Sequence, residues 1–147
     1  MGSTFVEFNQ KGFWANDSIL ELWLRLLALH LDEPSNDEVN IKLIRNQWLL
    51  ASRGFFQGCV PVELDSLIKT SSDSQVIEKA IASLVESLKT SGEILDEKHI
   101  NLLGFEYTWR KGVRVAGLIE MGESFQDLIS GKIVTSSSNA SHVPKTI

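Results

Sequence analysis

The sequence predicts an all-α protein, a compact bundle of five to seven helices around a mostly buried first helix. Two observations carry this prediction. Apolar residues recur at spacings of three and four in four segments of the chain, as they do on the buried face of a helix. Capping boxes, in which Ser is followed three residues later by Glu, begin at Ser18 and Ser35, where two of these segments start.

The first helix is predicted over residues 17 to 32. Within it the stretch SILELWLRLLALHL, from 18 to 31, is apolar on nearly every face, which is typical of a helix surrounded by neighbours. A narrow stripe at spacings of three and four is expected to face water. Its members are Asp17, Glu21, Arg25, Ala28 and Asp32. A membrane-spanning helix is disfavoured, because Glu21 and Arg25 would lie in hydrocarbon.

A second helix is predicted over residues 36 to 57, after a turn that contains Pro34. Its apolar face recurs at three and four and consists of Ile41, Ile44, Trp48, Ala51 and Phe55. Pro61 is well placed as the first residue of a short third helix, 61 to 69. A longer helix follows over 73 to 90, and Ser91-Gly92 ends it.

The remaining elements are shorter or ambiguous. Asp96 is expected to cap a short helix over 97 to 103. The stretch FEYTW, 105 to 109, alternates and predicts a short strand or extended segment before a last helix over 113 to 131. A hairpin over 105 to 118 is the competing interpretation. Residues 1 to 131 are thus predicted to form a single helical domain, and 132 to 147 a disordered tail with little to bury.

Composition narrows the possible functions. The chain has 147 residues, 43% of them hydrophobic, and a net charge of −5. This charge disfavours nucleic acid and anionic membranes as partners and permits a basic protein. A single cysteine excludes an internal disulfide, and the N-terminus lacks a basic region followed by an apolar run. The expected location is therefore the cytoplasm.

No motif predicts catalysis. Signatures of nucleophilic enzymes, calcium loops and phosphate-binding glycine loops are missing from the sequence, and His30, His99 and His142 lack the spacing of metal ligands. Cys59 is expected to be a buried structural cysteine, and His30 a hydrogen-bonded histidine in or beside the core. The sequence therefore predicts a protein that is not an enzyme and has neither a cofactor nor a metal.

Negative charge is concentrated near the N-terminus. Residues 1 to 38 hold seven acids and two bases, so their net charge equals that of the whole chain. Ordinary solubilising charge is one interpretation, and a face complementary to a basic protein is the other. On the second interpretation, the predicted partner-binding residues are Asp17, Glu21, Asp32, Glu33, Asp37 and Glu38.

The stretches GFWANDSILELWLRLLALHL and ASRGFFQGCVPVELDSLI, within residues 12 to 70, resemble small helical immunity proteins of bacterial polymorphic-toxin and contact-dependent growth inhibition systems. The resemblance implies a cytoplasmic protein that binds a toxin domain and blocks its active site, and it transfers no catalytic residues. Nuclease toxins are typically basic, so an acidic inhibitor could imitate their substrate. The alternative function is a helical adaptor or regulatory module that binds a partner through an apolar groove.

Overall fold

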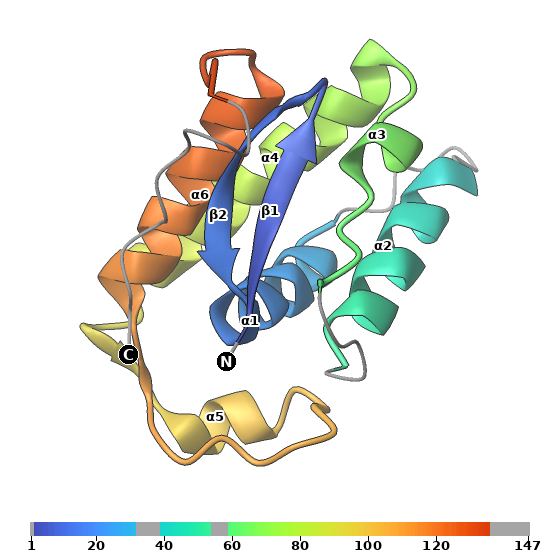
Figure 1. Cartoon of the computed structure of the whole chain (residues 1–147). Helices are drawn as coiled ribbons and strands as arrows, with labels where there is room; N and C mark the ends of the chain where they lie inside the picture. Colours follow the sequence, from blue (N-terminus) through green and yellow to red (C-terminus); the bar gives the residue numbers. More distant parts are fainter. Residues whose placement is uncertain (1, 32–38, 54–58, 136–147) are drawn as a thin grey trace.

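The structure, a computed structural model, describes residues 2–31, 39–53 and 59–135 (Figure 1). These ranges contain six helices and two small antiparallel sheets of two strands each. The helices are α1 (Asp17–Leu29), α2 (Val39–Ala51), α3 (Leu64–Leu67), α4 (Ser71–Lys89), α5 (Glu97–Asn101) and α6 (Val115–Ile129). The strands are β1 (Ser3–Phe8), β2 (Lys11–Asn16), β3 (Ile94–Leu95) and β4 (Val113–Arg114).

The prediction of an all-α fold is wrong, because the chain is mixed α and β. β1 and β2 form a hairpin, and its two-residue turn, Asn9 and Gln10, has positive φ angles of 53° and 69°. Such a turn matches the natural twist of paired strands. Alternate residues of both strands, among them Val6 and Phe13, face the core, which is the period of two that a strand requires.

The central position predicted for the first helix is confirmed. Trp23, Leu24 and Leu27 in α1 are completely buried, and α1 contacts β2, α2, α4 and α6. In Figure 1 it crosses beneath the hairpin. The capping residue differs from the prediction, because the Asn16 side chain, rather than that of Ser18, accepts a hydrogen bond from the Ile19 amide. α1 therefore starts where β2 ends, with no connecting loop.

Three residues of the α1 stripe that was expected to face water are buried in the structure. Glu21, Arg25 and Ala28 are all buried, with 7%, 9% and 0% of their surface exposed. The segment 102–109 covers Glu21 and Arg25, and three of its residues, Leu103, Phe105 and Tyr107, contact them directly. The polar spacing alone could not reveal this, because a distant segment of the chain supplies the cover.

The later helices follow their predicted apolar faces, with shifted ends. α2 buries Ile41, Ile44 and Trp48 as predicted, whereas Phe55 and the capping box at Ser35 lie outside the described residues. α3 has only four residues and starts at Leu64, not at Pro61. α4 begins two residues early, after a capping box formed by Thr70 and Asp73. α5 is capped by Asp96, as predicted.

Neither a strand over 105–109 nor a hairpin over 105–118 is present. β4 pairs instead with β3, which precedes α5, and α6 begins immediately after β4 at Val115. Part of the predicted tail contacts the hairpin: Thr135 accepts a hydrogen bond from the Gly12 amide and donates one to the Gly12 carbonyl. Residues 136–147 lie outside the described part of the chain.

Candidate functional site: a groove beside the N-terminal hairpin

Of the six predicted partner-binding residues, the structure describes two, Asp17 and Glu21. Asp32, Glu33, Asp37 and Glu38 lie outside the described residues. Asp17 is half-buried, and its carboxylate accepts a hydrogen bond of 2.6 Å from the hydroxyl of Thr4. This bond ties the first turn of α1 to β1, so Asp17 has a structural partner.

Glu21 is in an internal position. The Tyr107 hydroxyl donates a hydrogen bond of 3.3 Å to its carboxyl group. The pKa of Glu21 is raised to about 7, mainly by burial and in smaller part by the nearby Asp17, while the hydrogen bond from Tyr107 opposes the increase. With 7% of its surface exposed, Glu21 offers little area to a partner.

Arg25, one turn along α1, holds the covering segment in place. Its guanidinium group donates hydrogen bonds of 3.0 Å to the Ser52 hydroxyl and to the carbonyls of Leu49 and Leu103. It also lies over the ring of Phe105, 5.3 Å from the ring centroid. Arg25 therefore joins α1, α2 and the segment after α5 into one unit, which is a structural role.

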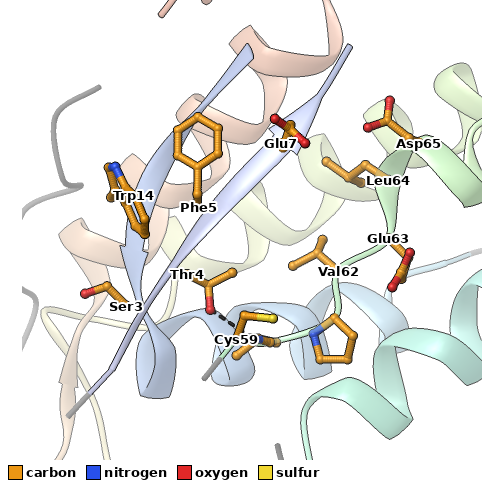
Figure 2. A pocket seen from close by; sticks show the side chains of 12 residues that line it. Ser3, Thr4, Phe5, Glu7, Trp14, Cys59, Val62, Glu63, Leu64 and Asp65 are labelled. Atoms are coloured by element: carbon orange, nitrogen blue, oxygen red, sulfur yellow. Dashed lines mark hydrogen bonds between the residues drawn. The ribbon is translucent and has the colours of Figure 1, made fainter. Parts of the chain in front are cut away.

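The described part of the chain has a groove of about 540 Å³ elsewhere, between β1 and the segment 59–65 (Figure 2). We call it the hairpin groove. It is lined by Ser3, Thr4, Phe5, Glu7, Trp14, Cys59, Val60, Pro61, Val62, Glu63, Leu64 and Asp65. One wall is thus the outer face and free side of the hairpin, and the other is the extended chain that leads into α3.

An aromatic pair forms the hairpin side of the groove. Phe5 and Trp14 are directly opposite each other in the strand register, and their ring centroids are 5.3 Å apart. Both lie on the face of the hairpin opposite to Val6 and Phe13, and both are half-buried. Trp is, with Tyr and Arg, one of the residue types that most often dominate binding energy at protein interfaces.

The second wall is fixed by side chains of α2 and β1. Trp48 and Gln47 donate hydrogen bonds to the carbonyls of Val62 and Pro61, at 3.0 and 2.9 Å. The Thr4 hydroxyl accepts a hydrogen bond of 2.8 Å from the Val60 amide. These contacts hold residues 59–63 extended, so that Val60 and Val62 point into the core and their neighbours point outward.

Cys59 is one of these outward residues, so the prediction that it is buried is wrong. The alternation in CVPVE could have shown this, because Val60 and Val62 are the apolar members of a period-two pattern. The prediction instead began a helix at Pro61, within this stretch. His30, in contrast, is half-buried and hydrogen-bonded to Ser83 at 3.1 Å, as predicted.

The rim of the groove is acidic. Glu7, Glu63 and Asp65 all line it, all are exposed, and the described residues of the lining include no Lys, Arg or His. The Asp65 carboxylate accepts a hydrogen bond of 2.9 Å from the Asn9 amide, which ties α3 to the hairpin turn. Glu63 adopts a left-handed conformation with φ of 58°, and Ser66 donates a 3.3 Å hydrogen bond to its carboxylate.

This arrangement is suited to binding a positively charged group against an aromatic surface. Among the described residues no three His, Cys, Asp or Glu side chains are grouped so that they could hold a metal ion. Within the same ranges, no helix has the length and apolar character needed to cross a membrane. Comparison with family models, curated proteins and solved structures gave no match to this chain.

Proposed function

We propose that this protein neutralises a basic toxin domain by binding it, as an immunity protein does, and that the hairpin groove is part of the contact surface. One observation carries the proposal. The groove brings an aromatic pair, Phe5 and Trp14, together with three carboxylates, and none of its described lining residues is basic. The resemblance of residues 12 to 70 to immunity proteins supports the same function.

Physical chemistry explains why such a groove suits an inhibitor of this kind. A nuclease-type toxin is basic where it holds phosphates, so an acidic partner is attracted to that surface and raises the rate of encounter. The aromatic rings then supply apolar contact area that is removed from water in the complex. Occupation of the phosphate site by carboxylates would block the substrate.

Growth protection tests this function. Any toxin domain found to be encoded beside this gene is expressed in a bacterial host with the parent chain or with a triple variant, Glu7→Gln, Glu63→Gln and Asp65→Asn. A control variant, Glu78→Gln, Glu93→Gln and Glu120→Gln, removes the same charge away from the groove. The parent and the control should restore growth. The groove variant should associate about tenfold more slowly with the purified toxin domain at low salt.

Equal association rates for the groove and control variants would show that the groove is not the contact surface. Growth arrest in the presence of the parent chain, with the toxin domain produced, would contradict the proposed function itself.

A second function, that of an adaptor, is favoured by one observation. A separate groove of about 460 Å³ lies between α4 and α6, and its lining includes Ile81, Ala82 and Val85. A partner helix could place apolar side chains there. Ala82 is exposed, so Ala82→Glu should abolish binding of an adaptor's partner and leave toxin neutralisation unchanged.

A further inference from the structure

The register of the hairpin decides which backbone groups of β1 face the hairpin groove. Phe8 and Lys11 flank the two-residue turn and form a hydrogen-bonded pair, and such pairs alternate along an antiparallel ladder. Val6 with Phe13, and Thr4 with Ala15, are therefore hydrogen-bonded pairs. Phe5 and Glu7 occupy the intervening positions, so their N–H and C=O groups point away from β2.

The opposite edge of the hairpin supports this assignment independently. Gly12, which faces Glu7 in the register, donates its amide to the Thr135 carbonyl at 3.0 Å, on the side of β2 away from β1. The outer edge of β2 is thus occupied at this position. In the described ranges, no backbone–backbone hydrogen bond outside the hairpin involves Phe5 or Glu7.

The edge of β1 lies along the hairpin groove (Figure 2). An edge strand with outward-pointing amides and carbonyls is a template for another strand. Phe5 and Glu7 are separated by about 7 Å along the strand, and Ser3 extends the edge to about 13 Å, the length of four to five extended residues. A short extended segment therefore matches the edge in length and in hydrogen-bonding groups.

We propose that β1 accepts an extended basic segment of the partner protein as an additional strand in the hairpin groove. This inference rests on the proposed function, because it specifies how the same groove would hold the toxin domain. The backbone of the segment would pair with Phe5 and Glu7. Its basic side chains would extend over Phe5 and Trp14 toward the rim carboxylates.

The negative charges around the hairpin groove favour a basic segment over an acidic or a neutral one. Glu7, Glu63 and Asp65 surround the groove with three negative charges, and the described lining residues contribute no positive charge to neutralise them. An acidic segment would be repelled, and a neutral one would leave the three negative charges unneutralised. Lys and Arg have long apolar stems that pack on aromatic rings while the charged end stays near a carboxylate in water.

Synthetic peptides test the inference with the unmodified full-length protein. The probe is an acetylated and amidated peptide of about seven residues in which Lys and Val alternate, near the usual length of a strand. Two derivatives carry N-methyl groups, one on the Lys amides and the other on the Val amides. A fourth peptide has Glu in place of Lys. Binding is followed by the amide resonances of Phe5 and Glu7, and by their hydrogen exchange.

The expected result has three parts. The Lys-Val peptide shifts and protects the Phe5 and Glu7 amides. One methylated derivative binds at least about tenfold more weakly than the other, because only alternate amides of an added strand face β1 and each lost hydrogen bond costs about 1 kcal/mol. The Glu-Val peptide binds at least about tenfold more weakly than the Lys-Val peptide, because two or more charge contacts are lost.

Equal binding of both methylated derivatives would overturn strand addition, and so would a Lys-Val peptide that leaves the Phe5 and Glu7 amides unprotected. Neither outcome bears on growth protection, which is measured with the folded toxin domain. A chain that neutralises the toxin through the three carboxylates but fails the peptide test keeps the proposed function and loses this inference.

Discussion

The carboxyl group of Glu21 makes the free energy of unfolding depend on pH. Its pKa is about 7 in the folded protein, against an ordinary value of 4.5, mainly because the group is buried. The folded state therefore binds this proton more tightly than the unfolded state does. The stability that the protonated carboxyl contributes is fully present below about pH 4.5 and is lost as the pH rises through 7.

The size of this effect follows from the pKa difference. One pKa unit corresponds to about 1.4 kcal/mol, so the difference between 4.5 and about 7 amounts to at most about 3.5 kcal/mol. Glu21 is only 7% exposed, but its hydrogen-bond partner Tyr107 is 37% exposed, so water reaches the pair from one side. We therefore expect about 1 to 2 kcal/mol in a measurement.

Glu21→Gln isolates this contribution, because the amide does not titrate and its carbonyl oxygen still accepts a hydrogen bond from Tyr107. Urea denaturation is followed by tryptophan fluorescence at about pH 5 and pH 8. The measured quantity is the unfolding free energy of the variant minus that of the parent. It should be about 1 to 2 kcal/mol more positive at about pH 8 than at about pH 5.

The exposed Glu120 on α6 offers a matched control, and Glu120→Gln should follow the parent at both pH values. The reasoning about the buried carboxyl would be refuted if the difference in unfolding free energy between Glu21→Gln and the parent were the same at both pH values.

Three further predictions concern stability and accessibility. Arg25→Lys should lower the unfolding free energy by about 2 to 4 kcal/mol, because an ammonium group cannot reach the three diverging oxygens that the guanidinium binds. Arg53→Lys is the control: Arg53 forms an exposed ion pair, so the loss should be under about 1 kcal/mol. Gly122→Ala should lower the unfolding free energy by about 1 to 3 kcal/mol, because a Cβ there would lie 2.8 Å from the ring of Trp23. Glu123→Ala on the same helix is the control and should change stability little. Equal denaturation midpoints for the two variants would contradict the close packing at Gly122. Cys59 should react with a thiol reagent in the native protein, and Cys59→Ala should change stability by under about 0.5 kcal/mol; a thiol that reacts only after denaturation would contradict its exposure.

Much of the helical part of the fold could be predicted from local sequence patterns. The apolar face of α4, the buried residues of α1 and the cap at Asp96 follow from spacing and from hydrogen bonds within a few residues. The N-terminal hairpin has only a weak local signature, because the apolar residues Val6 and Phe13 on one face are adjacent in sequence to Phe5 and Trp14 on the other. Its turn, Asn9-Gln10, lacks the glycine that usually marks such a hairpin, so the signal was missed.

The candidate site could not be predicted in the same way. Glu7 and Asp65 are nearly sixty residues apart in sequence, and the hairpin brings them to one groove through the bond from the Asn9 amide to Asp65. The sequence showed the acidic excess of residues 1 to 38 but not which carboxylates share a surface. Two of the acids in that count, Asp17 and Glu21, have partners within the fold.

By itself, the sequence determined the apolar faces, most of the helices and the net negative charge, because these depend on residues close together in the chain. Only the tertiary structure decided that Glu21 and Arg25 are internal. The physical reason is that exposure depends on which distant segment covers a surface. Residues of the segment 102–109 cover Glu21 and Arg25, and they lie about eighty positions further along the chain.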